Sequence, residues 1–446
     1  MTTTHDSDTG SANDENSANN EGKEKRKDQL SFANDVVWSL GFDGLTVVAN
    51  IVAFLLIGRN FGNEGYGSYI SLFGIIGPLG GLAWAGVGLA ALQRIVRDEQ
   101  DPSDVTRSML GQGLLLASAG SVLATAIALL TVRSLNLLEI TSIVFAELMA
   151  LTVVMISSFV LQGVKGVPAA SRLRITVVLI RLGVVVGLFL TGQLSVAGIG
   201  ISTSILFTLL TIWVLFRSLP AAGLNVLPGR FGKDDRNMAL SFSVPLIGSN
   251  LQLDGDKTVL TAYGMEEVAG VYGAAFRVIN MAFTPIRALQ SAMHNRLLPH
   301  DADDHGLHVR RAKTFAMLNM ATIIPIGIVL FFGVELFEPF FGSDFAESSR
   351  IARWLLIFMP IKALSSVPLG GLLGLGRTST RAWVMGIAAI ISLALYIALI
   401  PIWSWVGAVV GTVIGELVLL VLGTERLLTW QRRSDAESVL ASEPSA

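Results

Sequence analysis

Two apolar segments of this sequence carry polar and charged side chains at regular helical spacing. The first, residues 238–262, holds four of them at positions i, i+4, i+7 and i+11: Asn250, Asp254, Lys257 and Thr261. At 100° per residue, these positions lie on one face of a helix. The second, residues 268–298, repeats the pattern with Arg277, Asn280, Thr284, Arg287 and Ser291. Charged groups are costly in hydrocarbon and usually face a bundle interior or a watery cavity, so the two stripes predict a wet, electropositive cavity.

The basic side chains of such a cavity could bind phosphate. Lysine and arginine neutralise phosphate, and arginine does so through two parallel hydrogen bonds. Arg287 is the leading candidate because it lies near the middle of its segment; a salt bridge that joins two helices is the alternative. Lys257 and Arg277 lie closer to a membrane surface, toward which they could instead extend. The predicted substrate-binding residues are Arg287, Arg277, Lys257, Asn280, Asn250, Arg181 and Lys362.

Carboxylates inside apolar segments are the candidates for ion coupling. A carboxylate in a poorly solvated cavity can bind and release a proton, and this role is predicted for Asp43, Asp254 and Asp256. Charge compensation for the cations of the cavity is the alternative. The histidine-rich segment 300–308 is short and hydrophilic, so a solvated loop is favoured over a metal site. We predict no metal site, no cofactor and no catalytic residue.

The elements that position these residues are membrane-spanning helices. Hydrophobic residues make up 52% of the chain and charged residues 15%, against roughly 25% charged in soluble domains. Apolar runs of twenty or more residues recur from Val36 to Leu428, as spanning helices require. The chain contains no cysteine, which excludes disulfides and thiolate metal sites. The sequence therefore predicts an all-α integral membrane protein.

Twelve transmembrane helices account for the apolar runs. We place them near residues 36–57, 66–92, 106–132, 139–162, 173–192, 194–216, 238–262, 268–298, 312–333, 351–375, 382–402 and 404–425.

The distribution of basic residues predicts the orientation of these helices, because lysine and arginine accumulate in cytoplasmic loops. With the N-terminus inside, cytoplasmic segments hold 23 of the 32 basic residues and external loops hold 4, namely Arg59, Arg133, Arg350 and Arg353. We therefore expect a multi-pass protein of the cytoplasmic membrane with both termini in the cytoplasm.

The two halves of the chain resemble each other. Residues 62–69 and 264–272 both give a glycine, an acidic turn and Gly-x-Tyr, with Tyr69 and Tyr272 offset by 203 residues. The first predicted helix also carries the stripe spacing of the seventh, with Ser39, Asp43, Thr46 and Asn50. Because six spans return the chain to its starting side, the halves should be two six-helix lobes related by a parallel pseudo-two-fold repeat.

Composition divides the chain into five parts. The ends are polar, with little to bury, and a segment rich in proline and glycine follows the sixth span. The predicted parts are a disordered tail 1–30, an N-lobe 31–217, a cytoplasmic linker 218–237, a C-lobe 238–428 and a disordered tail 429–446.

Short motifs relate the sequence to a known family. They are the opening Asp35-Val36-Val37-Trp38-Ser39, the turn at residues 62–69, and Asp256-Lys257-Thr258-Val259-Leu260 followed by residues 270–277. Over residues 30–430 the chain resembles the polysaccharide and oligosaccharide flippases of the multidrug/oligosaccharidyl-lipid/polysaccharide (MOP) exporter superfamily. The resemblance implies a two-lobed bundle that alternates access and moves lipid-linked sugars across the cytoplasmic membrane.

That resemblance implies several partners and leaves rival functions to weigh. The implied partners are a polyprenyl-pyrophosphate-linked glycan, membrane lipid, and a glycan polymerase or glycosyltransferases; no nucleic acid is expected. An ion-coupled multidrug exporter of the MATE type shares the architecture but would favour a carboxylate-dominated cavity. A membrane glycosyltransferase or polymerase would favour a large external loop with convergent acid–base groups, which the sequence lacks. A transporter for surface polysaccharide biosynthesis, without enzyme activity, is therefore the leading hypothesis.

Overall fold

The structure is a computed structural model that describes the backbone of residues 9–224, 227–287, 289, 305–336, 338–339 and 342–442. Side chains are described for residues 41, 44–224, 227–287, 289, 312–335, 338–339 and 342–430. The predicted features outside these ranges include the side chains of Ser39 and Asp43, residue Ser291, and the side chains of segment 300–308.

The first two crossings are two helices joined without a loop, at a sharp bend at Gly62. Helix α1, Thr9–Gly80, has non-helical dihedral angles at Gly62 (φ 67°, ψ −172°) and continues through a π-helical turn, Gly81–Ala85, into α2, Gly86–Val96. A positive φ suits glycine because it has no β-carbon to clash. The chain therefore reverses at Gly62, and this bend separates the first crossing from the second.

The remaining helices follow in chain order, joined by short connections. The N-lobe continues with α3 (Pro102–Thr131), α4 (Leu137–Val144), a π-helical segment η2 (Phe145–Ala150), α5 (Leu151–Lys165), α6 (Val167–Leu190) and α7 (Val196–Trp213). The C-lobe contains α8 (Lys233–Ala262), α9 (Glu266–Met281), α11 (His305–Gly333), α13 (Ala346–Leu355), α14 (Phe358–Gly374), α15 (Thr378–Trp403) and α16 (Trp405–Ser442).

The helices account for twelve crossings. Among the described residues, eight helices are long and apolar enough to span a membrane, or nine if the pair α13–α14, bent by 48°, counts as one span. The first of these eight contains the bend at Gly62 and so supplies two crossings. The helices α8 and α9 complete the set; α8 falls outside that group because it is polar, and α9 because it has only 16 residues. The predicted twelve-helix, two-lobe bundle is confirmed.

The helices extend further than predicted at three boundaries. Helix α1 already includes residues 9–30, and α16 includes residues 429–442, where the sequence predicts disordered tails. Adding residues to an existing helix avoids the cost of nucleation, so a polar segment can continue an apolar span. Helix α8 begins at Lys233, inside the predicted linker 218–237.

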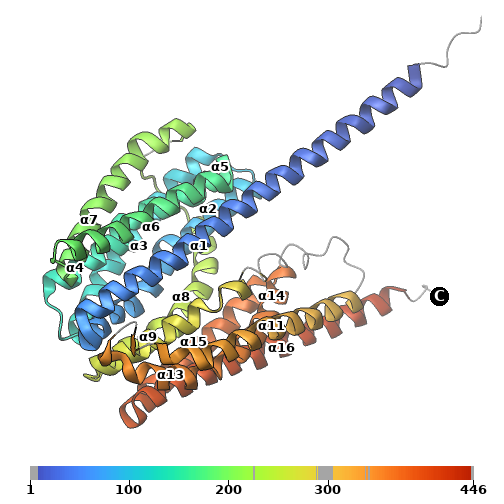
Figure 1. Cartoon of the computed structure of the whole chain (residues 1–446). Coiled ribbons are helices and arrows are strands. Elements are labelled where there is room, and N and C mark those ends of the chain that lie inside the picture. The colour runs from blue at the N-terminus through green and yellow to red at the C-terminus, as the bar shows by residue number, and fades with distance from the viewer. Residues whose placement is uncertain are drawn as a thin grey trace, which may run out of the picture.

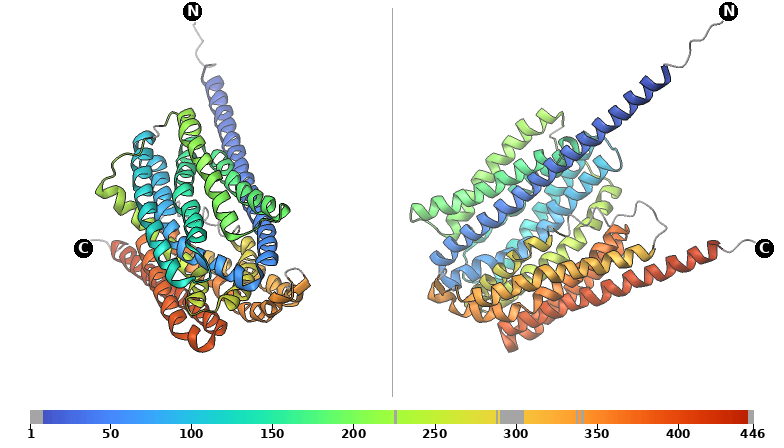
Figure 2. Two further views of the ribbon diagram at one scale, coloured as in Figure 1. Left: turned by 90° about the vertical axis from the view of Figure 1, so that its left-hand side faces the viewer. Right: turned by 45° about the vertical axis from the view of Figure 1, so that its right-hand side comes forward.

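The two lobes occupy separate parts of the bundle and are distinguished by colour in Figure 1. The N-lobe runs from blue to green, the C-lobe from yellow to red, and α8 passes between the two (Figure 1). The start of α1 and the end of α16 lie at the same end of the molecule, which we call the termini end (Figure 2). The bend at Gly62 and the start of α9 lie at the other end, here called the turn end.

Close backbone contacts at the turn end follow the repeat. A β-carbon added at Gly67 would collide with the carbonyl of Glu266, and one added at Gly270 would collide with the carbonyl of Asn63. Both pairs of equivalent positions, Asn63 with Glu266 and Gly67 with Gly270, differ by 203 residues. Small residues let helix backbones approach this closely. The contact is therefore made twice, once from each lobe, as a pseudo-two-fold axis requires.

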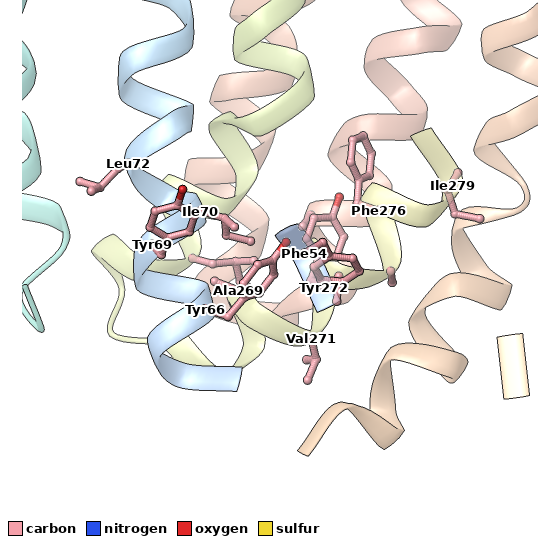
Figure 3. Packing of buried hydrophobic residues seen from close by; sticks show 14 of the residues in the cluster. Phe54, Tyr66, Tyr69, Ile70, Leu72, Ala269, Val271, Tyr272, Phe276 and Ile279 are labelled. Carbon is pink, nitrogen blue, oxygen red and sulfur yellow. The ribbon is translucent and has the colours of Figure 1, made fainter. Parts of the chain in front are cut away.

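Aromatic side chains fill the space around this contact. Phe54, Tyr66 and Tyr69 from α1 lie beside Tyr272 and Phe276 from α9 (Figure 3). Tyr69 and Tyr272, which the sequence matches at the offset of 203, are both buried in this one cluster. The lobes thus share a continuous hydrophobic core at the turn end.

Candidate functional site

A cavity of about 560 Å³ lies between the lobes, enclosed by both arms of α1, by α8 and by α9. We call it the central cavity. Its walls are formed by Gly44, Thr46, Val47, Asn50, Tyr66, Ile70, Phe73, Leu253, Asp254, Lys257, Gly273, Phe276, Arg277, Asn280, Met281, Thr284 and Arg287.

The polar stripes supply most of the charge and hydrogen-bonding capacity of this cavity. Both lobes contribute: Thr46 and Asn50 come from α1, and the remainder from α8 and the α9 region. The described lining holds three cations and one carboxylate, so it is electropositive. The stripe residues lining it are Thr46, Asn50, Asp254, Lys257, Arg277, Asn280, Thr284 and Arg287.

Two stripe residues of α8 do not line the cavity. Asn250 donates its side-chain amide to the carbonyl of Gly77 in α1, at 2.9 Å, and so joins α8 to the other lobe. Thr261 is buried and donates to the carbonyl of Thr258 in its own helix, at 3.0 Å. The stripe extends over 11 residues, or roughly 16 Å along the helix, so side chains at its two ends can contact neighbouring protein instead of the cavity. Asn250 is therefore placed as a contact between helices.

Lys257 is buried between two carboxylates. Only 2% of the residue is exposed, and its ammonium nitrogen lies 3.3 Å from a carboxylate oxygen of Asp254 and 2.9 Å from one of Asp256. The ring of Phe276 lies 4.0 Å from the same nitrogen, in cation–π geometry. Extension to the membrane surface is therefore wrong for Lys257. Its charge is compensated inside the protein.

Adjacent acidic residues of α8 face in different directions. Asp254 lines the central cavity with 32% of its side chain exposed, whereas Asp256 is completely buried. Asp256 accepts a hydrogen bond from the hydroxyl of Tyr272, at 2.6 Å, and Tyr272 lies beside Thr412 of α16. Of the predicted ion-coupling residues with described side chains, Asp254 faces the cavity and Asp256 belongs to the C-lobe interior.

Arg277 is a cavity cation with no carboxylate partner among the described residues. Among the described residues, no carboxylate oxygen lies within 4 Å of its guanidinium; the ring of Phe54 lies 5.9 Å away and Asp254 acts on it only at longer range. It follows the start of α9 by 11 residues, or roughly 16 Å at 1.5 Å per residue, which is about half of a 30 Å hydrocarbon layer. Arg277, predicted to be shallow, is thus placed deep in the bundle.

Arg287 lies beyond a break in the helix. Helix α9 ends at Met281, and a turn at residues 282–283 precedes the next helical residues. The exposed guanidinium of Arg287 donates to the hydroxyl of Thr284 at 2.9 Å and to the carbonyl of Asn280 at 3.4 Å. Arg287 therefore lies nearer the termini end than Arg277. The sequence favours Arg287 as the leading candidate for phosphate binding, whereas depth in the bundle favours Arg277.

A profile of the polysaccharide biosynthesis protein family matches residues 32–288, which is more than half of the chain and includes α8, α9 and most of α1. This chain belongs to the polysaccharide biosynthesis protein family. The resemblance seen in the sequence motifs is thereby confirmed. A search of curated proteins finds no match.

Solved structures share the fold of this polysaccharide biosynthesis family member. An inward-facing MATE multidrug resistance transporter of the MOP superfamily matches with a TM-score of 0.67 and 13% identity over 89% of this chain and 99% of its own. The MATE multidrug transporter DinF-BH, solved as a complex, matches with a TM-score of 0.63 and 16% identity over 90% of this chain and 94% of its own.

A third structure differs in how its pocket is described. It is a MOP superfamily transporter from Pyrococcus furiosus, with a TM-score of 0.62 and 14% identity over 88% of this chain and 95% of its own. Its binding pocket is described as having reverse polarity, which suggests a different function. Together these likenesses show that this family member is a multi-pass membrane protein with the MOP transporter fold.

The two remaining predicted cations lie outside the central cavity. Arg181 of α6 forms an ion pair with Glu147 of η2, at 2.5 Å, in the wall of a second cavity within the N-lobe. Lys362 of α14 lies 3.6 Å from Glu416 of α16 and packs over the ring of Phe358. Lys362 lines neither cavity.

Sequence reasoning missed Glu147 as a site residue, although it was recognisable. An acidic residue within an apolar span normally has a partner, and Arg181 lies in the middle of a neighbouring span. Tyr66 and Phe73 were missed because aromatic residues in membrane helices give no signal that separates a cavity wall from a core. No cluster of metal ligands occurs among the described residues.

Proposed function

We propose that this protein is an alternating-access flippase that carries a lipid-linked oligosaccharide across the cytoplasmic membrane for surface polysaccharide biosynthesis. The observation that carries the proposal is the guanidinium of Arg277. It faces the central cavity near mid-membrane without a carboxylate partner among the described residues. A charge in that position is costly unless it is compensated. An anionic headgroup that enters the cavity would compensate it.

The headgroup of such a substrate is a pyrophosphate, and the cavity offers it polar side chains at successive depths. Arg287 lies toward the termini end and Arg277 deeper, with Asn280 between them in the chain. A guanidinium binds phosphate through two parallel hydrogen bonds, whereas an asparagine amide adds a neutral donor. The pyrophosphate would meet Arg287 first and then bind at Arg277, while the lipid tail stays in the bilayer between the lobes.

Alternation requires the contact at the turn end to open. In the present state, the Gly67 and Gly270 contacts join the lobes there. The excess of basic residues at the termini end favours a cytoplasmic position for that end, so this state would accept substrate from the inner leaflet. Rocking of the lobes would part the glycine contacts and release the headgroup outside.

The cavity charge favours this function over the rival hypotheses. Export of cationic drugs would be opposed by the described lining of the cavity, which holds three cations and one carboxylate, Asp254, itself paired with Lys257. Cleavage of a glycosidic bond by acid–base chemistry commonly uses two carboxyl groups, and the described lining of the central cavity holds one. Described MOP relatives include a pocket of reverse polarity, so the fold is compatible with more than one type of substrate.

Transport by the purified protein tests the proposal. Proteoliposomes would contain a fluorescent polyprenyl-pyrophosphate disaccharide, and its exposure outside would be measured after adding a membrane-impermeant quencher. Wild-type protein should move the probe, Arg277→Ala should abolish movement, and Arg277→Lys should retain part of it. Arg353→Ala is the matched control, since Arg353 pairs with Glu335 on an exposed surface. Full transport by a well-folded Arg277→Ala protein would refute the proposed mechanism.

A further inference from the structure

The second cavity opens beside the proposed phosphate-binding position. It has a volume of about 210 Å³ and lies within the N-lobe between α1, η2 and α6; we call it the side cavity. Four residues line both this cavity and the central one: Thr46, Asn50, Phe73 and Arg277. The two spaces therefore adjoin at Arg277. A group attached to a pyrophosphate bound there would lie at the opening of the side cavity.

The side cavity contains a paired donor and acceptor. Arg181 contacts a carboxylate oxygen of Glu147 at 2.5 Å, and 42% of the arginine side chain remains exposed. The Nε–H group of Arg181 is buried and has no hydrogen-bond partner among the described residues. Glu147 lies in the π-helical segment η2, and such segments occur frequently at functional sites. The pair thus retains hydrogen-bonding capacity.

The net charge of this wall distinguishes it from the central cavity. An arginine and a glutamate cancel in charge, so the pair gives no general attraction for phosphate, yet it can both donate and accept hydrogen bonds. Around it lie the aromatic edge of Phe73 and the ring of Tyr69, which meet at 5.3 Å in an edge-to-face pair. A small pocket with apolar walls and a few polar groups suits a neutral ligand with several hydroxyl groups.

We propose that the side cavity is a sugar subsite, which binds the neutral pyranose ring attached directly to the pyrophosphate. This inference rests on the proposed function, since Arg277 must hold the pyrophosphate for the ring to reach Glu147 and Arg181. It assigns a specificity role to these two residues: they select the first sugar of the glycan, while Arg277 binds the group that all such substrates share.

Binding measurements separate the sugar from the phosphate. The full-length protein in lipid nanodiscs would be titrated with polyprenyl pyrophosphate, and with the same lipid carrying one glucose or one galactose. Wild-type protein should bind at least one hexose-bearing lipid about tenfold more tightly than polyprenyl pyrophosphate, a difference of about 1.4 kcal/mol. Equal affinity for all three ligands would overturn the inference.

Two variants remove the subsite by different means. Glu147→Leu with Arg181→Met replaces the ion pair by apolar groups of similar size, an exchange that often preserves stability. Val178→Phe leaves the pair intact and fills part of the cavity. Both proteins should lose the tenfold preference for the hexose-bearing lipid and keep wild-type affinity for polyprenyl pyrophosphate. A preference that survives in either folded variant would refute the subsite.

The control and a third variant distinguish the two proposals. Arg353→Met with Glu335→Leu makes the same kind of exchange at an exposed ion pair outside both cavities and should keep both affinities. Arg277→Ala should weaken the binding of all three ligands by a similar factor. If wild-type protein binds none of them, the proposed function fails, and the sugar subsite with it. If polyprenyl pyrophosphate binds through Arg277 without any hexose preference, only the subsite fails.

Discussion

Gly67 and Gly270 occupy equivalent positions in the two lobes and pack against each other at the turn end. A β-carbon added at Gly67 would lie 2.7 Å from the backbone nitrogen of Gly270, closer than protein atoms normally approach. Because neither glycine has a side chain, the backbones of the two lobes can approach closely at that end. The pair therefore sets how tightly the lobes close there.

Gly270→Ala should prevent full closure at the turn end. Overpacking of a tight contact typically costs about 1–3 kcal/mol, which would favour conformations with the lobes apart. We expect slower transport and greater labelling of cysteines introduced near Asn63, measured in this naturally cysteine-free chain. Gly187→Ala is the control because nothing lies within 4 Å of its β-carbon position. Unchanged labelling and transport in Gly270→Ala would contradict the role of the contact.

The two cavity arginines should differ in their kinetic effects. Arg287 lies at the termini end of the cavity, so Arg287→Ala should raise the substrate concentration for half-maximal transport and leave the maximal rate near the wild-type value. Arg277→Ala should abolish transport even at saturating substrate. Initial rates at varied probe density in proteoliposomes measure both quantities. The reverse assignment, with Arg287→Ala abolishing transport at saturating substrate, would restore the ranking given by the sequence.

Because Lys257 is paired with Asp256, replacing Lys257 should destabilise the protein strongly, and a second substitution at Asp256 should restore the stability. Lys257→Met leaves the fully buried Asp256 without its cation and should cost about 3–5 kcal/mol, as removing one partner of a buried pair does. Adding Asp256→Asn should recover most of this loss. Thermal unfolding in detergent gives the comparison. If the double variant is less stable than Lys257→Met alone, the carboxylate has another essential partner.

A second buried ion pair joins α2 to the start of α8. Arg94 contacts Asp235, which also accepts hydrogen bonds from Ser108 at 2.7 Å and from the backbone N–H of Gly232 at 2.6 Å. Asp235→Ala should therefore destabilise the protein by about 3 kcal/mol or more, because Arg94 would remain buried without a counter-charge. The neighbouring Asp234→Ala, at an exposed position, is the control in the same unfolding measurement. Equal effects of the two substitutions would exclude a special role for Asp235.

The excess of basic residues at the termini end predicts the orientation in the membrane. Single cysteines would be introduced at Gln193, in the exposed loop between α6 and α7, and at Arg230, in the segment before α8. A membrane-impermeant maleimide applied to intact cells should label Gln193→Cys and leave Arg230→Cys unlabelled until the membrane is opened. The opposite pattern would invert the orientation and the direction of access proposed for the cavity.

The sequence by itself determined the number of crossings, the two lobes and the stripes that line the central cavity. These features depend on local physics: hydrocarbon excludes charge, and helical periodicity assigns each polar residue to a face. The offset of 203 residues between Tyr69 and Tyr272 likewise anticipated the repeat. Eight of the predicted stripe positions accordingly meet at one cavity.

Only the tertiary structure decided which charges are compensated. Asp254 and Asp256 are two positions apart, yet one faces the cavity and the other is held by Tyr272. Arg181 is paired and Arg277 is not, because Glu147 lies beside the first and no described carboxylate lies within 4 Å of the second. Ion pairing falls off over a few ångströms between helices that are distant in the sequence, and the periodicity of a single helix holds no information about that distance.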